Sequence, residues 1–232
     1  MTNTNKLMIE YVCTGNNGRS PMAEAIALDY VHRKGLEDRI EICSSGSRLH
    51  ELTKATGEAY LKQQLWIIDL ALKNGIYQES WRQTEAGKVL TEGKEMMAGT
   101  STDAGKSLSK SYESVRDALE EYMMYAVNVE AMFRNMALFE KGLVAGGKYH
   151  KSTEARHSGL ILPMAESNAA EVRTIYERSA FAPRVEPLNV YAGLEGEVTN
   201  PFCQLLPTYQ ATREDLMRSV PISIEKAVEE HL

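Results

Sequence analysis

Short apolar runs and helical stripes alternate along this chain. Leu7 to Val12 is a short run rich in strand formers, and residues 22–33 then place apolar side chains on one helical face. The same pattern predicts three more strands and two more helices, with strands at 40–44, 160–164 and 185–190, one helix that follows residues 166–168 and runs to about 179, and another at 213–230. Strands that alternate with helices over short connections predict an α/β fold, a doubly wound parallel four-stranded sheet flanked by helices.

The middle of the chain departs from this alternation. Residues 48–147 are mostly helical in pattern, with one helix ending near Asn74-Gly75 and a longer one running to Gly142. The longer helix carries an apolar stripe, which consists of Tyr112, Val115, Leu119, Tyr122, Ala126, Val129, Phe133, Met136 and Phe139. Such a stripe is more often core than recognition surface, and a homo-oligomer formed through the insertion is the alternative. We therefore expect an α/β domain at 1–47 and 148–232, with a mainly helical insertion at 48–147.

Composition argues against several classes of function. The 232 residues are 43% hydrophobic and 25% charged, as in an ordinary globular protein. A formal net charge of −6 argues against a nucleic-acid or anionic-membrane partner, and no apolar stretch reaches membrane-spanning length or resembles a signal peptide. The three cysteines, Cys13, Cys43 and Cys203, are too few and scattered for a disulfide framework or a zinc site, so we expect a cytoplasmic protein without a metal.

Two histidines precede the third predicted strand. His150 and His157 flank Glu154, but a metal site usually needs a further ligand in matching geometry, and the sequence signals none. We therefore interpret these side chains as solvated surface.

The candidate chemistry lies between the first strand and the first helix. Cys13 ends the strand, Arg19 follows six residues later, and Pro21 suits the first helical position. Gly15 and Gly18 permit backbone angles that turn successive N–H groups inward, which makes an oxyanion site at a helix N-terminus. These dipoles and the Arg19 guanidinium favour a Cys13 thiolate. The guanidinium can also hold two oxygens of a tetrahedral anion while the sulfur attacks its centre.

Two blander interpretations of this stretch are weaker. A cysteine six residues before an arginine often occurs by chance, and Asn17-Gly18 is also a hairpin-turn sequence. A hairpin needs a strand on its far side, whereas Arg19-Ser20-Pro21 leads into a helix. The flanking strand and helix therefore favour a catalytic or anion-binding loop.

Residues 12–24 resemble the phosphate-binding loop of the low-molecular-weight protein tyrosine phosphatase family. The matching residues are Val12, Cys13, Gly15, Asn16, Arg19, Ser20, Pro21, Met22, Ala23 and Glu24. The resemblance implies that Cys13 is a nucleophile forming a phosphocysteine intermediate, without metal or cofactor, and that Arg19 clamps the phosphate. It implies that Asn16 and Ser20 hold the loop and support the thiolate. The residues expected to line the substrate are Thr14, Gly15, Asn16, Asn17 and Gly18.

This chain departs from the family pattern inside the loop and near the third strand. Many members carry a second cysteine where this chain has Gly18, so a protective disulfide within the loop is not expected. The family usually has an aspartate after the methionine that ends the third strand, and here that position is Ala165.

The general acid of the family is also missing. The family supplies it from an Asp-Pro-aromatic segment, where this chain has Asn200-Pro201-Phe202. A general acid contributes about two to four orders of magnitude, and an amide cannot donate its proton at neutral pH. We expect Asn200 to position substrate or water and Phe202 to form an aromatic wall. Three explanations stay open: Glu195 or Glu197 replaces the acid, the leaving group needs little help, or the protein binds phosphate with little turnover.

The sequence therefore predicts a cysteine-dependent phosphatase acting on a phosphorylated protein or a small phosphomonoester. Thr14 resembles the residue after the cysteine in the protein arginine phosphatase branch, which adds phosphoarginine as a candidate substrate. An arsenate reductase is the second candidate function, with Cys43 and Cys203 as resolving thiols by elimination. The third is a non-catalytic module that binds phosphate or a phosphoprotein.

Overall fold

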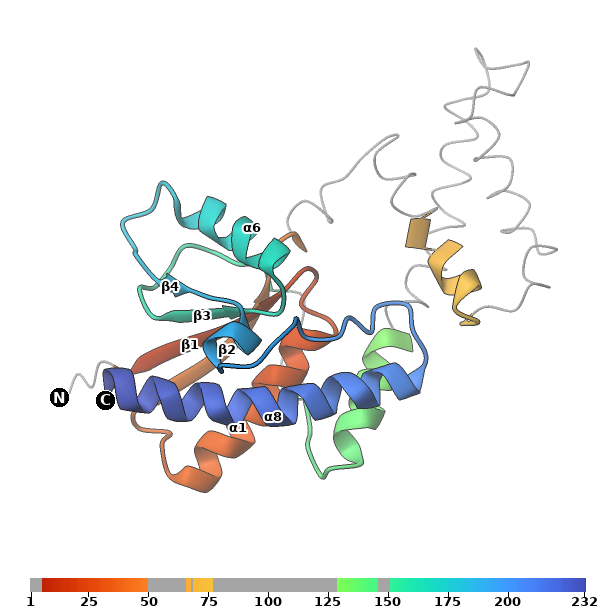
Figure 1. The fold of residues 1–232 in the computed structure, drawn as a ribbon, viewed down its shortest axis with the longest axis horizontal. Helices are drawn as coiled ribbons and strands as arrows, with labels where there is room; N and C mark the ends of the chain where they lie inside the picture. The colour runs from red at the N-terminus through yellow and green to blue at the C-terminus, as the bar shows by residue number, and fades with distance from the viewer. Residues whose placement is uncertain (1–5, 50–65, 68, 77–128, 146–150) are drawn as a thin grey trace, which may run out of the picture. The chain divides into compact units, whose positions relative to one another are not determined.

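The computed structural model of this chain describes residues 6–49, 66–67, 69–76, 129–145 and 151–232. The named elements are, in chain order, β1 (Leu7–Cys13), α1 (Arg19–Lys34), β2 (Ile40–Gly46), β3 (Leu160–Pro163), α6 (Glu166–Tyr176), β4 (Arg184–Val185), α7 (Leu188–Tyr191) and α8 (Leu206–His231) (Figure 1). Residues 129–139 are also helical.

The strands form one parallel sheet in the order β2-β1-β3-β4. Their register pairs Cys13 with Gly46 and Val12 with Pro163, so β1, β2 and β3 end at the same edge. The predicted four-stranded parallel sheet flanked by helices is thus confirmed. Sheets of this kind bind ligands beyond the carboxyl ends of their strands, which here is the position of the loop after Cys13.

The side chains of β1 alternate between two apolar layers. Ile9 and Tyr11 pack into the larger core together with residues of α1 and α8. Val12 points to the opposite face, where it packs with Val172 and Tyr176 of α6. Figure 1 shows the same arrangement, with α6 on one side of the sheet and α1 and α8 on the other. The central strand is therefore covered on both faces, as its nearly continuous apolar sequence requires.

The chain divides into two compact units. The first comprises Met1–Thr53, Ala131–Phe202 and Leu206–Leu232, and the second comprises Lys54–Glu130 and Cys203–Leu205. The sheet and the Cys13 loop belong to the first unit. In the second, helical residues 69–73 are followed by a turn at Asn74-Gly75, where Gly75 has φ of 74°, so the predicted helix end is confirmed. The extent of the predicted insertion stays a prediction.

Three predicted element boundaries were wrong. The fourth strand spans only Arg184–Val185, because Pro187 has no N–H to give to a sheet and instead precedes the short helix α7. Helix α8 begins at Leu206, well before the predicted start at 213. Helix α1 begins at Arg19, so Pro21 lies in its first turn rather than at its first position.

The apolar stripe predicted for residues 112–139 can be checked only from residue 129 onward. Between 131 and 139 the buried side chains are Arg134, Ala137 and Leu138. Met136 and Phe139 are exposed, Phe139 by 76%, so their assignment to the core is wrong. The buried face of this helix therefore includes the Arg134 guanidinium, which contacts Asn17 in the loop after Cys13. The rest of the stripe lies outside the described residues.

Candidate active site

The loop from Thr14 to Gly18 is held by the end of β2. The Ser47 N–H donates to the Cys13 carbonyl at 2.8 Å, and the Arg48 N–H donates to the Thr14 carbonyl at 3.1 Å. Gly46 lies directly against the loop, because a Cβ at this position would stand 2.9 Å from the Thr14 carbonyl oxygen and 3.0 Å from the Asn16 nitrogen. The small residues of the Ser45-Gly46-Ser47 turn therefore allow its backbone to pack directly against the backbone of the loop.

The Asn16 side chain links the loop to three other segments by hydrogen bonds. Its backbone adopts φ of 52°, a left-handed conformation that asparagine tolerates better than most side chains. The buried side-chain amide donates to Ser20 Oγ at 3.1 Å and to Ser44 Oγ at 2.9 Å, while its Oδ1 accepts the Lys151 N–H at 2.9 Å. One side chain thus ties the loop to α1, to β2 and to the segment before β3.

A carboxyl group completes this network. Ser44 Oγ donates to Glu24 Oε2 at 2.5 Å, so Glu24 on α1 and Asn16 in the loop share one hydroxyl. Burial raises the pKa of Glu24, against the opposing effects of the Ser44 hydrogen bond and the Lys151 charge. The relay fixes the orientation of Ser44 and hence of the Asn16 amide.

The Cys13 sulfur lies at the carboxyl end of β1 and accepts a hydrogen bond from Ser20. The distance from Ser20 Oγ to Cys13 Sγ is 3.1 Å, and both residues are buried. The Ser20 hydroxyl also lies 3.2 Å from the Ser45 carbonyl, so its single proton has two acceptors. A thiolate is the stronger acceptor because it is charged, so loss of the thiol proton directs the Ser20 proton to sulfur. Helix α1 has no acidic residue in its first turn, which leaves its N-terminus suited to an anion.

Arg19 connects the loop to the segment that carries Asn200. Arg19 is 8% exposed, and its Nη1 donates to the Val198 carbonyl at 3.4 Å. Asn200 follows two residues later and is exposed, with its Oδ1 accepting the Phe202 N–H at 3.4 Å as in an Asx turn. Cys13, Arg19 and Ser20 are thus brought together, and Asn200 and Phe202 lie on a segment that Arg19 contacts.

Glu197, a candidate replacement for the missing acid, has another structural role. Helix α6 starts after Ala165, whose side chain has no group that can cap the helix. Glu197 Oε1 instead accepts the Glu166 N–H at 2.8 Å. A carboxylate from a distant loop therefore caps α6 at the position where this chain lacks the family's aspartate.

A second network lies beside Thr14. Asn168 of α6 is 1% exposed, and its Nδ2 donates to Thr14 Oγ1 at 3.1 Å and to Ser47 Oγ at 3.3 Å. Ser47 Oγ in turn donates to Glu171 Oε2 at 2.5 Å. The Thr14 hydroxyl already accepts from Asn168, so its own proton is available for another acceptor. Sequence analysis assigned Thr14 to the loop but missed Asn168, whose position in the first turn of α6 was the available signal.

Sequence analysis also missed Arg134. This arginine is 2% exposed, and its Nη1 donates to the Asn17 carbonyl at 2.5 Å, with Asn17 Oδ1 3.4 Å away. It comes from the helical residues 129–139, outside the loop motif. The signal was present in the spacing, because Ala137 and Leu138 follow Arg134 at the three- and four-residue intervals that share a helix face.

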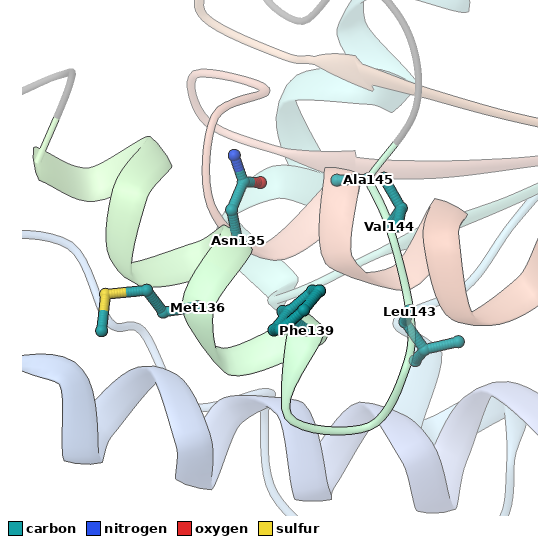
Figure 2. Close-up of a pocket in the computed structure, with 6 residues that line it drawn as sticks. All are labelled: Asn135, Met136, Phe139, Leu143, Val144 and Ala145. Carbon is teal, nitrogen blue, oxygen red and sulfur yellow. The ribbon is translucent and has the colours of Figure 1, made fainter.

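An apolar pocket lies elsewhere on the same helix. Figure 2 shows its lining residues, which are Asn135, Met136, Phe139, Leu143, Val144 and Ala145. These residues supply no nucleophile and no cation, so the pocket does not have the chemistry of the Cys13 loop. Among the residues that the structure describes, no group of His, Cys, Asp and Glu side chains could hold a metal ion, and no helix is long and apolar enough to cross a membrane.

The interpretation of His157 as solvated surface is wrong. His157 is buried on the α6 side of the sheet, where its Nε2 lies 2.7 Å from Glu10 Oε2. The Gly159 N–H donates to His157 Nδ1 at 3.0 Å, so the ring proton is on Nε2 and is donated to the carboxylate. Arg156 adds a second donor to Glu10 at 3.2 Å. His150 lies outside the described residues.

Glu10 is the buried centre of an ion cluster, in which His157 is also buried and the Arg156 side chain is 41% exposed. Burial acts to raise the pKa of Glu10, but hydrogen bonds from His157 and Ser45 and the Arg156 charge outweigh it, so the pKa lies below its ordinary value. Cys43 lies beside the cluster, and burial raises the pKa of its thiol to about 12. The cluster is part of the sheet's support and not of the Cys13 site.

Comparisons with known proteins agree with the loop and the sheet. A family model described as low molecular weight phosphotyrosine protein phosphatase matches residues 8–85. No match was found among curated protein sequences. Similar solved structures are a YwlE mutant from Bacillus subtilis (20% identity, 97% of this chain and 99% of that chain covered, TM-score 0.52), a protein tyrosine phosphatase from Entamoeba histolytica (11%, 98% and 100%, 0.55) and the Drosophila arginine phosphatase DARP (15%, 97% and 97%, 0.52). At these identities the structures support the fold alone.

The resemblance inferred from residues 12–24 is therefore confirmed. The matched segment contains the whole Cys13 loop, and the parallel sheet has the fold of these phosphatases. The family match supports a hydrolase of the low-molecular-weight phosphotyrosine phosphatase type.

Proposed function

We propose that this protein is a cysteine-dependent phosphatase that acts through a phosphocysteine intermediate. The observation that carries the proposal is the Ser20 hydroxyl 3.1 Å from Cys13 Sγ, in a loop that ends at the N-terminus of α1 beside the buried Arg19. A phosphate dianion at the loop would receive N–H dipoles and the Arg19 guanidinium. The sulfur lies at the base of the same loop.

The reaction has two steps. The Cys13 thiolate attacks phosphorus, a sulfur–phosphorus bond forms, and the bond to the leaving oxygen breaks with its electron pair on that oxygen. Water then attacks the phosphocysteine, which releases inorganic phosphate and restores the thiolate. The Ser20 hydrogen bond stabilises the sulfur anion at the start of the first step and at the end of the second.

The first step lacks a carboxylic acid at the family's usual position. Asn200 cannot protonate the leaving oxygen, and Glu197 has one carboxylate oxygen engaged at the α6 N-terminus. We therefore expect good turnover only for substrates whose leaving group is stable as an anion, such as an aryl oxide. A protein phosphorylated on tyrosine or a small aryl phosphomonoester fits this requirement better than an alkyl phosphate.

Phosphoarginine is the second substrate class to test. Asn168 occupies only one of the two acceptor lone pairs of Thr14 Oγ1, so the hydroxyl can still accept an N–H of a phosphorylated guanidinium at this edge of the loop. DARP, one of the similar structures, is described as an arginine phosphatase. These two observations support the test without deciding its outcome.

The arsenate reductase alternative is weaker. Its chemistry needs a second thiol that is reactive as a thiolate, and burial raises the pKa of Cys43 to about 12 and that of Cys203 to about 12. Arg156 donates to the Cys43 sulfur at 3.4 Å and acts to lower the pKa of this thiol, but burial outweighs it.

The deciding experiment is pre-steady-state kinetics with p-nitrophenyl phosphate on the native protein, Cys13→Ser and Asn200→Asp. We expect a burst of p-nitrophenolate from the native protein and none from Cys13→Ser. Asn200→Asp should raise turnover of an alkyl phosphate by more than that of the aryl ester, by up to about a hundredfold. If the native protein and Asn200→Asp bind inorganic phosphate but turn over neither ester, the protein is a phosphate-binding module and the proposal fails.

A further inference from the structure

Arg134 is a buried charge that has to be explained. It is 2% exposed and shares its helix face with Ala137 and Leu138, both fully buried. A guanidinium stays protonated in proteins, and burying it is costly unless its N–H groups find acceptors. An apolar side chain would fill this position at lower cost, so the contacts of Arg134 indicate what its charge is for.

Arg134 contacts the phosphate-binding loop. Nη1 donates to the Asn17 carbonyl at 2.5 Å and lies 3.4 Å from Asn17 Oδ1, while Nε donates to Asn135 at 3.0 Å. Asn17 is itself buried, so this carbonyl could not otherwise rely on water. The contact joins two segments 117 residues apart in sequence.

The carbonyl that Arg134 holds belongs to the Asn17–Gly18 peptide. A trans peptide is planar, so its N–H points away from its C=O. Fixing the Asn17 oxygen on the Arg134 side therefore fixes the Gly18 N–H on the other side. Glycine offers little steric resistance to rotation of the peptide before it, so this peptide needs an external hold, as does the Thr14–Gly15 peptide, whose carbonyl accepts the Arg48 N–H.

We propose that Arg134 is a positioning residue for oxyanion binding, which holds the Asn17–Gly18 peptide so that the Gly18 N–H donates to the bound phosphate. Its charge adds to the positive potential of Arg19 from the outer side of the loop. This inference rests on the proposed function, because it needs an oxyanion at the Cys13 loop. It assigns a role in that site to a residue outside residues 12–24.

The helix of Arg134 also supplies a matched control. Arg213 of α8 is another buried arginine, 5% exposed, and its Nη1 donates to a carbonyl of the same helix, that of Ala137, at 2.5 Å. Arg213 pairs with Glu140 at 2.7 Å as well. Replacing Arg213 therefore loosens the same helix without removing a donor from the loop.

The experiment compares Arg134→Met, Arg134→Lys and Arg213→Met with the native protein. Three quantities are measured: Tm, the Kd for inorganic phosphate, and kcat and KM for p-nitrophenyl phosphate. In the native protein and each variant, the Gly18 amide is also followed by NMR as phosphate is added. We expect Arg134→Met to weaken phosphate binding and lower kcat by roughly ten- to hundredfold, and to abolish the Gly18 amide shift. Arg134→Lys, which keeps a charged donor, should recover part of the phosphate affinity and part of kcat.

Arg213→Met should lower Tm to a similar degree while leaving the phosphate Kd and kcat within about twofold of native. Equal phosphate affinity in Arg134→Met and Arg213→Met would overturn the proposal, as would a Gly18 amide that does not move when native protein binds phosphate. If Arg134→Met does not fold, Arg134→Lys and the native amide shift still decide the matter. A native protein that neither binds nor hydrolyses phosphate would instead remove the proposed function itself.

Discussion

Ser20→Ala is the most direct test of how this loop activates its sulfur. The substitution removes one buried hydroxyl and leaves the rest of the network, because Asn16 still donates to Ser44 and the loop backbone keeps its contacts with Ser47 and Arg48. Alanine also fits a helix interior well, so α1 should form as before. The change therefore removes the contact between the hydroxyl and Cys13, together with the hydrogen bond that the hydroxyl accepts from Asn16.

The expected magnitude follows from the kind of hydrogen bond. The distance from Ser20 Oγ to Cys13 Sγ is 3.1 Å, within the range for a hydroxyl donating to sulfur, and the acceptor carries a full charge when it reacts. Hydrogen bonds to charged groups contribute about 1.5–3 kcal/mol. Since about 1.4 kcal/mol corresponds to a factor of ten, Ser20→Ala should lower kcat/KM for p-nitrophenyl phosphate by roughly ten- to hundredfold.

The assay pairs steady-state kinetics with the rate at which iodoacetamide alkylates Cys13, measured on the same samples at pH 7. Both rates should fall together, because both depend on the sulfur anion. Ser45→Ala is the control: Ser45 is equally buried, but its hydroxyl lies 2.7 Å from Thr153 rather than beside the sulfur. If Ser45→Ala slows alkylation as much as Ser20→Ala does, the effect is a general loosening of the site and the argument from the hydrogen bond is refuted.

Three further outcomes are expected. The pKa of Glu10 is lowered in the folded state, so its contribution to the free energy of unfolding is fully present above the ordinary value of 4.5 and is lost as pH falls through the folded-state pKa. In denaturant titrations the free energy of unfolding of the native protein should therefore fall below about pH 4.5. That of Glu10→Gln should be smaller at pH 7 and should depend less on pH in acid. Glu197→Ala should cost about 1 kcal/mol of stability, by loss of the cap at Glu166, with kcat unchanged; a large loss of kcat on alkyl phosphates would instead make Glu197 the acid. Gly46→Ala should lower kcat/KM at least tenfold, because the new Cβ would lie 2.9 Å from the Thr14 carbonyl oxygen; normal kinetics would contradict the close approach.

The parts of the site that could be predicted from sequence are those set by neighbouring residues. Cys13, Ser20 and Arg19 lie within one strand, one loop and one helical turn, so their proximity follows from local geometry. The sheet could be predicted because β1 to β3 carry apolar runs of the right length. Distant contacts depend on the folded topology, and Arg134 was missed although it shares a helical spacing with Ala137 and Leu138, because a charged residue in a helical pattern is normally assigned to the solvent face.

The errors have the same physical origin. Phe139 and Met136 fit a helical period, yet the period alone does not say which face meets the core. His157 sits in a polar stretch, and only the pairing of strands places it against Glu10. Glu197 could not be recognised as a cap because its helix begins 31 residues earlier in the chain. Each of these residues depends on a partner that the folded topology supplies.

Hydrogen bonds to several other elements hold the segment from Glu197 to Thr199 in place. The Val198 N–H donates to the Met164 carbonyl at 3.2 Å, the Val198 carbonyl accepts from Arg19, and Thr199 Oγ1 donates to Asp215 at 2.8 Å. Asn200 therefore directly follows a segment that is held by hydrogen bonds. An aspartate at position 200 would start from the same fixed backbone, without a loop closing first. In the genetic code an asparagine codon and an aspartate codon differ by a single base. If the restored acid works as expected, a slow and a fast form of this protein are separated by one point mutation, with no rebuilding of the scaffold in between.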